Sequence, residues 1–277
     1  MSGVNAVEIL SNRTKNSFAI IYPGTKMSIQ KTSAFVLKSI NWKDASKITT
    51  LFTRELGKVN VIAKGAKRMN SPYRGLLESL NLLDVYIYFS PKRDLQTLGD
   101  INLENSFNSI RGSLLKIGYA LSILELVESF FDYGNPDITF FDFSKQIFYN
   151  LDESDDEQVI FWYYLLKLAS YLGFKPEFLI CRSCGKQIGG NEVNFSMSEG
   201  SVLCSSCLPF GKNIFKIIKS DLEILAAIQQ TPYKKAARIK AGVVRQLNFT
   251  DFLLQYIQFH TGQKLELSSL KLLKSIK

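Results

Sequence analysis

Histidine is almost absent from this sequence, because His260 is the only one in 277 residues. Clusters of histidines that bind a metal are therefore excluded. Any general acid–base or nucleophilic mechanism that needs histidine would depend on this single ring. Its place near the end of an expected helix predicts a packed or capping role instead.

Other catalytic motifs are missing as well. There is no G-x-x-x-x-G-K-[ST] loop, which excludes a P-loop ATPase. Asp84, Asp94 and Asp100 match no spacing typical of a nuclease metal site, and we interpret them as turn and barrel-rim residues. We therefore expect a protein that is not an enzyme.

Long apolar runs are also missing. The stretch Ile117–Leu124 stops before Glu125, and the stretch 159–172 is interrupted by Lys167. Both are shorter than the roughly 18 to 20 apolar residues of a membrane span. The N-terminus has no recognisable secretion signal, so we expect a cytoplasmic protein without a membrane partner.

Cysteine is scarce, but its spacing is informative. Cys181 and Cys184 form one C-x2-C pair, Cys204 and Cys207 form a second, and the interval between them is typical of a zinc ribbon. Four thiolates complete a tetrahedral shell and leave no position for water, so the pattern predicts one structural Zn2+. Gly185 suits the tight turn after the first pair.

Disulfides and buried thiols are the alternatives to zinc, and disulfides are disfavoured in a reducing compartment. A hairpin expected over Asn194–Cys204, turning at Ser198-Glu199-Gly200, would bring the two pairs together.

The net charge of +9 is unevenly distributed. Residues 31–100 carry twelve basic and six acidic side chains. Residues 101–180 carry five basic and twelve acidic side chains, and residues 181–277 carry fourteen basic and six acidic side chains. Two basic ends around an acidic middle favour contact with a polyanion such as DNA. A merely soluble basic protein is the alternative interpretation.

The N-terminal part has the pattern of a small β-barrel. Five short strands are expected between Thr32 and Leu103, with turn signals at Gly57, Gly65, Ser71-Pro72 and Ser90-Pro91. This pattern is typical of a five-stranded OB-fold, with an SH3-like barrel as the alternative. We assign residues 31–105 to this DNA-binding domain and residues 1–30 to an extension that is disordered or lies upstream of a true start at Met27.

Helical periodicity follows the barrel. We assign residues 106–180 and 208–277 to a helical domain and residues 181–207 to a zinc-binding insert, which gives an α+β fold overall. A capping box at Ser220-Asp221-Leu222-Glu223 predicts a helix that ends near Gln229, and further helices are expected near Lys235 and over 247–261. The acidic run 152–157 is interpreted as helix punctuation or as a docking site for a basic partner.

The connection after the third strand is rich in cations. Such a loop can follow a phosphate backbone while an aromatic side chain stacks on a base. For Trp42 and Tyr73, core packing and base stacking remain equal alternatives. The candidate DNA-contacting residues are Lys43, Lys47, Arg54, Lys58, Lys64, Lys67, Arg68, Tyr73, Arg74, Lys92 and Arg93.

Several segments together resemble a known family. They are Ser33-Ala34-Phe35-Val36-Leu37-Lys38, Thr49-x-Leu51-Phe52-Thr53-Arg54-Glu55-x-Gly57-Lys58, Ala63-Lys64-Gly65-Ala66-Lys67-Arg68, the four cysteines, and Gly262-x-Lys264-Leu265-x-Leu267-Ser268. In this order they resemble the bacterial DNA repair protein family RecO, from Thr32 to about Leu273.

The resemblance implies a non-catalytic recombination mediator. It implies binding of single- and double-stranded DNA, annealing without ATP, and cooperation with RecR, RecF and single-strand-binding protein in loading the recombinase RecA. It also implies a nucleoid-associated protein. Two other functions remain open from the residues alone: a zinc-ribbon RNA-binding or translation-associated factor, and a protein-interaction scaffold.

Overall fold

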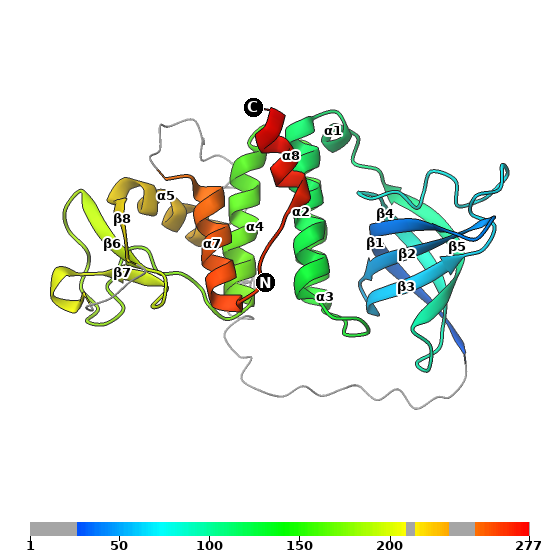
Figure 1. The fold of residues 1–277 in the computed structure, drawn as a ribbon, viewed down its shortest axis with the longest axis horizontal. Coiled ribbons are helices and arrows are strands. Elements are labelled where there is room, and N and C mark those ends of the chain that lie inside the picture. The colour runs from blue at the N-terminus through cyan, green and yellow to red at the C-terminus, as the bar shows by residue number, and fades with distance from the viewer. Residues whose placement is uncertain (1–26, 209–213, 233–246, 277) are drawn as a thin grey trace, which may run out of the picture.

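The computed structural model describes residues 27–208, 214–232 and 247–276. A β-barrel, a central group of helices and a three-stranded sheet follow one another along the long axis of the molecule (Figure 1). The predicted α+β class is confirmed. Residues 1–26 of the expected extension and the helix expected near Lys235 lie outside the described residues. Residues 28–30, also assigned to the extension, belong to the first strand.

The barrel has the OB-fold arrangement that the sequence predicts. Its strands close in the order β1-β2-β3-β5-β4, with β3 and β5 parallel and the other pairs antiparallel. Because β5 lies between β3 and β4, the barrel has a Greek-key connection, and the SH3-like alternative is wrong. The strands are β1 (Ser28–Trp42), β2 (Ser46–Thr53), β3 (Gly57–Ala63), β4 (Leu82–Phe89) and β5 (Leu95–Asn105).

Alternation along the strands separates two cores. In β3, Val59, Val61 and Ala63 point into the barrel, where they join a cluster of small and β-branched side chains. In β1, the register shifts between Val36 and Lys38, so the strand is irregular there.

The outer face of the barrel is buried against the helices at one end. Phe35 and Phe52 are 0% and 1% exposed, and they belong to the main helical core instead of the barrel core. The ring of Phe35 lies 4.6 Å from that of Phe148, and the ring of Phe52 lies 5.4 Å from that of Phe141. These contacts join the barrel to the helix that carries Phe141 and Phe148.

The helices form the centre of the molecule (Figure 1). Ser113 and Asp137 cap the two helices that follow them, because each side chain accepts a hydrogen bond from a backbone N–H of the first turn. The helices are α1 (Asn108–Arg111), α2 (Leu114–Phe130), α3 (Ile138–Glu153), α4 (Glu157–Tyr171), α5 (Lys219–Gln230), α7 (Phe249–Thr261) and α8 (Ser268–Ile276).

Two expectations about helix ends need correction. The capping box is not formed, because α5 begins at Lys219, so that Ile218 and not Ser220 is the N-cap, and no side chain caps it. Asp221 in the first turn accepts a hydrogen bond from the backbone N–H of Leu247 at 3.1 Å. The acidic run is only partly helix punctuation. Asp152 lies in the last turns of α3 and accepts from the backbone N–H of Ile110 at 2.8 Å, whereas Glu157 lies in the first turn of α4.

In the ranges that the structure describes, none of the helices is long and apolar enough to cross a membrane.

Glu104 ties the end of β5 to α3. It pairs with Lys145 and accepts from Ser33 at 2.9 Å and from Tyr149 at 3.2 Å. Burial acts to raise the pKa of this carboxyl, but the hydrogen bonds from Lys145 and Ser33 outweigh it, so the pKa is lowered.

We predict that Glu104→Gln lowers the free energy of unfolding at pH 7 by about 0.5–1 kcal/mol, because a partly exposed ion pair contributes little more. A carboxyl whose pKa is lowered by folding stabilises above its unfolded pKa and loses this effect as the pH falls through the folded value. The difference between wild type and variant should therefore disappear in acid, which urea titrations between pH 7 and pH 3 would measure. A difference that grows in acid would contradict the assignment.

Candidate metal centre and nucleic-acid interface

A small sheet lies at the far end from the barrel (Figure 1), and the four cysteines lie in the turns that flank its first two strands. It consists of β6 (Glu192–Ser196), β7 (Ser201–Leu203) and β8 (Ile214–Ile218), in the order β7-β6-β8, with the 3-10 turn Ser205–Cys207 after β7. The predicted hairpin is present, because Ser196 pairs with Ser201 across a turn in which Gly200 has a φ of 61°. This hairpin brings the second cysteine pair back to the first.

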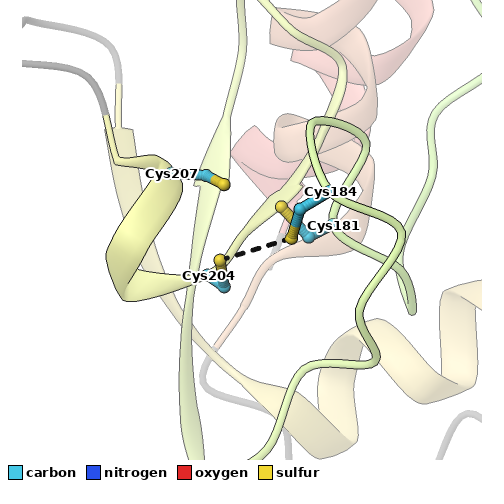
Figure 2. A group of neighbouring side chains, drawn as sticks. All are labelled: Cys181, Cys184, Cys204 and Cys207. Atoms are coloured by element: carbon cyan, nitrogen blue, oxygen red, sulfur yellow. Dashed lines mark hydrogen bonds between the residues drawn. The ribbon is translucent and has the colours of Figure 1, made fainter.

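The four sulfurs converge on one point (Figure 2). All lie within 4.8 Å of one another, and the Sγ atoms of Cys184 and Cys204 are 3.7 Å apart. Ligands at 2.3 Å from a tetrahedral zinc ion would be about 3.8 Å apart. None of the four cysteines forms a disulfide. The donor set and its spacing therefore fit one tetrahedral metal ion.

The first cysteine pair lies in a turn built to present sulfur. The backbone N–H of Gly185 donates to the carbonyl of Cys181 at 2.7 Å, and Gly185 takes a φ of 72°, a conformation that glycine adopts without strain. The backbone N–H of Cys181 donates to the carbonyl of Lys186 at 2.9 Å. This closed loop is what the sequence predicted for the C-x2-C-G segment.

The sulfurs also interact electrostatically. Burial acts to raise the pKa of the Cys181 thiol, but backbone N–H groups of Cys204, Cys184 and Ser183 outweigh it and lower that pKa to about 6. Hydrogen bonds from the Cys207 thiol to Cys204 and Cys184 raise its pKa to about 12. Thiolates this close repel one another, so a bound cation is what allows all four to ionise.

His260 has the packed role that the sequence predicted. Its ring stacks on that of Phe174 at 5.0 Å and lies 4.5 Å from that of Tyr256. Burial lowers its pKa. The ring is therefore part of the packing of α7 against the segment that follows α4.

The predicted basic connection lies at one end of the barrel. It runs from Lys64 to the start of β4, and the backbone N–H of Lys67 donates to the carbonyl of Ala45 at 3.0 Å. This hydrogen bond joins it to the β1–β2 turn, which contains Lys43. We call Lys43, Lys64, Lys67, Arg68 and Arg74 the loop cations, and all five are exposed.

Three other candidate cations are held by protein groups. Arg54 donates to both carboxylate oxygens of Asp142 at 2.7 and 2.8 Å. Lys58 is 5% exposed and donates to the backbone carbonyl of Glu128 at 2.7 Å, and burial lowers its pKa. Lys47 forms an ion pair with Glu78 at 3.1 Å.

The remaining candidates lie in turns. Lys92 and Arg93 are exposed in the β4–β5 turn. Tyr73 is half-buried, and its hydroxyl donates to the carbonyls of Leu98 at 3.1 Å and Gly99 at 2.9 Å. Burial raises its pKa. These contacts anchor the basic connection to β5, whereas Trp42 is 43% exposed at the end of β1.

A groove on the outer face of the barrel was missed by the sequence analysis. Its residues come from three strands, from the start of β5 and from the α2–α3 connection, and several are apolar yet exposed. We call it the barrel groove, and it is lined by Lys38, Ile40, Ile48, Thr50, Asn60, Asp94, Leu95 and Tyr133. The signal in the sequence was the pair Ile40 and Ile48, which alternate with inward residues of their strands and face each other across β1 and β2.

Comparison with known families decides the classification. The family model described as Recombination protein O N terminal matches residues 27–107, and Recombination protein O C terminal matches residues 111–269. The chain belongs to the RecO family. The N-terminal match covers the barrel, and the C-terminal match covers most of the helices and the cysteine cluster.

Individual relatives agree with this classification. The chain is 26% identical to a protein from Desulforamulus reducens over 87% of its own length and 93% of the relative. It is 27% identical to a protein from Alkaliphilus metalliredigens over 89% of its own length and 99% of the relative. It is 34% identical to a protein from Salinibacter ruber over 63% of its own length and 67% of the relative. Each of these relatives is named DNA repair protein RecO.

We predict that the protein purified without added metal contains one metal ion per chain, and that Cys181→Ser loses it. The variant should lower the free energy of unfolding by about 3–5 kcal/mol, because loss of a bound metal is among the largest single-site effects. Elemental analysis and thermal melts would measure both. The matched control is Ser183→Ala, within the same turn, which should keep metal and stability. Freshly reduced wild type with four titratable thiols and no metal would contradict the site.

Proposed function

We propose that this protein is a non-catalytic, DNA-binding recombination mediator in DNA repair. The observation that carries the proposal is a closed OB-type barrel, in a chain of the RecO family, whose exposed loop cations gather at one end of the strands. OB barrels with basic loops bind nucleic acid through backbone phosphates. Residues 31–105 are the proposed DNA-binding domain, 106–180 and 208–277 the helical domain, and 181–207 the zinc insert.

The loop cations are the proposed phosphate contacts, together with Lys92 and Arg93. Among the described residues, no carboxylate forms an ion pair with any of these seven side chains. Arg54 and Lys58 are better suited to holding the barrel against the helices, because protein groups already satisfy them. Tyr73 shapes the basic connection, and Lys47 adds charge beside it.

The proposed activity is annealing of complementary single strands without ATP. A basic surface can bring two strands together by neutralising their phosphates, and this needs no nucleotide site. By resemblance to the RecO family, the protein would act with RecR, RecF and single-strand-binding protein in loading RecA on covered DNA, in the cytoplasm at the nucleoid.

The metal is proposed to be zinc in a structural role. Four cysteine sulfurs at tetrahedral spacing are the ligand set that zinc prefers, and they leave no open coordination position. The four cysteines would bind the ion, and the ion would cross-link the two turns in which the cysteine pairs lie. This cross-link would restrain the sheet β7-β6-β8.

We predict that the protein accelerates annealing of complementary strands in EDTA and without nucleotide. The physical reason is that phosphate neutralisation by the loop cations requires neither magnesium nor hydrolysis. Fluorescence-quenching assays with labelled DNA strands, and parallel binding assays with RNA, would measure it. A strict requirement for ATP would refute the mediator mechanism, and tighter binding to RNA would favour a translation-associated role.

We predict that reversing Lys64, Lys67 and Arg68 to glutamate weakens binding to single-stranded DNA and flattens its salt dependence. Each lost phosphate contact should reduce the slope of log K against log salt by about 0.7, so three contacts would reduce it by about 2. The matched control reverses the exposed Arg182, Lys186 and Lys216 near the metal centre, with the same change of net charge. Equal losses in both variants would mean that DNA responds to total charge and not to the basic connection.

A further inference from the structure

The α2–α3 connection, residues 131–137, is fastened to the barrel. The backbone N–H of Gly134 donates to the carbonyl of Lys58 at 3.0 Å, and Lys58 forms an isolated parallel bridge with Tyr133. At Gly57 a Cβ atom would lie 2.5 Å from the carbonyl oxygen of Asn135, so the turn before β3 accepts the connection only because it has no side chain. The helical domain thus places a defined segment on the outer face of β3.

Tyr133 is held in this segment with its ring partly open to solvent. The Nζ atom of Lys58 lies 4.5 Å from the ring centroid, and it is fixed by its hydrogen bond to Glu128. Lys58 is buried, whereas Tyr133 is 50% exposed. One face of the ring therefore rests on a buried cation, which restricts the ring and leaves its other side available for contact.

The barrel groove extends from Tyr133 across residues of four strands, β1, β2, β3 and the start of β5. Its apolar floor contains Ile40 and Ile48, which pair across β1 and β2, and Leu95, which pairs with Asn60. Thr50 donates to Asn60 Oδ1 at 2.8 Å. That bond uses one of the two acceptor positions of the amide oxygen, so Asn60 can offer a ligand its Nδ2 donor and the second position of Oδ1. Such a surface suits flat apolar rings with polar edges.

We propose that the barrel groove is a base-binding site for single-stranded DNA, shared between the two domains, in which an unpaired base stacks on the open face of the Tyr133 ring. This proposal rests on the proposed function and adds a site that the helical domain completes. A flat base fits the groove because stacking needs only a fixed aromatic ring, and it is tolerant of sequence.

The strands connect this site to the phosphate contacts. From Lys58 beside Tyr133 to Lys64 among the loop cations, β3 covers about 20 Å at 3.3 Å per residue. The smallest sites of OB-folds hold about four nucleotides, which a strand along this path would satisfy. Charge sets the orientation. Asp94 lines the groove beside Leu95 and repels phosphate from the groove itself, so bases lie over it, while the backbone can contact Lys92 and Arg93 in the adjoining turn and the loop cations at the far end.

The decisive experiment compares Tyr133→Ala, Tyr133→Phe and Tyr88→Ala in the full chain. Tyr88 is a control of the same residue type, 39% exposed on β4 and outside the groove. Tyr133→Ala should weaken binding of an oligothymidine strand by about five- to a hundredfold. Its salt slope should remain unchanged, because no phosphate contact is removed. Duplex binding should also remain unchanged, because duplex bases already stack on one another and are not free to stack on the ring. The phenylalanine variant and the Tyr88 variant should bind like wild type.

Cross-linking tests the same point in the unaltered protein. A strand containing 5-iodouracil, irradiated in the complex and mapped by mass spectrometry, should join to the peptide that contains Tyr133. Wild type that binds no single-stranded DNA would refute the proposed function itself. Wild type that binds normally, with Tyr133→Ala unaffected and cross-links confined to other peptides, would overturn only the base site. A Tyr133→Ala variant that changes oligomeric state at full DNA affinity would assign the groove to a second copy of the chain and overturn the proposal as well.

Discussion

The burial of two phenylalanines from the outside of the barrel is the contact on which the rest of the structure depends. Phe35 and Phe52 are almost completely buried in the helical core, where they meet aromatic rings of α3. Full burial of one such side chain stabilises by about 1.5–3 kcal/mol, and aromatic pairs add to this. Because this contact fixes the barrel on the helices, it determines which part of the outer face stays open and where the α2–α3 connection can lie.

The same docking sorts the positive charge of the barrel. Arg54 and Lys58 lie near the contact with the helices, and their charges are satisfied there by Asp142, by a backbone carbonyl and by the ring of Tyr133. Lys58 is buried, and a buried cation without partners would be costly. Arg54 is more exposed but donates to both carboxylate oxygens of Asp142, so withdrawing either cation for DNA would loosen the interface. The five loop cations lie at the opposite end of the strands, where they are free to meet phosphate. Position relative to the helices, more than total charge, therefore defines the proposed DNA surface.

Much of this could be predicted from local sequence, and what could not depends on contacts between distant segments. The five strands, the hairpin at Gly200 and the convergence of the cysteines follow from alternation, turn chemistry and spacing. The capping box failed because α5 begins at Lys219, which places Ser220 inside the first turn and not at the N-cap. Asp221 meets the backbone of Leu247, 26 residues away, through a contact that no local pattern reveals. Lys58 alternates as an exposed strand residue does, and only the docking of the helices buries it. The barrel groove was missed for the same reason, since Tyr133 lies far from the strands in sequence.

The position of the metal centre determines how it can affect the proposed DNA surface. Phe195 of β6 lies 5.2 Å from Phe252 of α7, and the hydroxyl of Tyr256 in α7 donates to the carbonyl of Phe174 at 2.9 Å. The sheet is therefore packed on α7, which contacts α4 within the central helices, while the barrel lies at the other end of the molecule (Figure 1). Val193, Phe195 and Val202 of this sheet are buried in the main core, so apolar packing already holds the strands, and a metal ion would cross-link the two cysteine turns beside them. Loss of the metal should affect the barrel only through the packing of α7 and α4. We therefore expect it to lower the stability of the protein before it changes DNA binding.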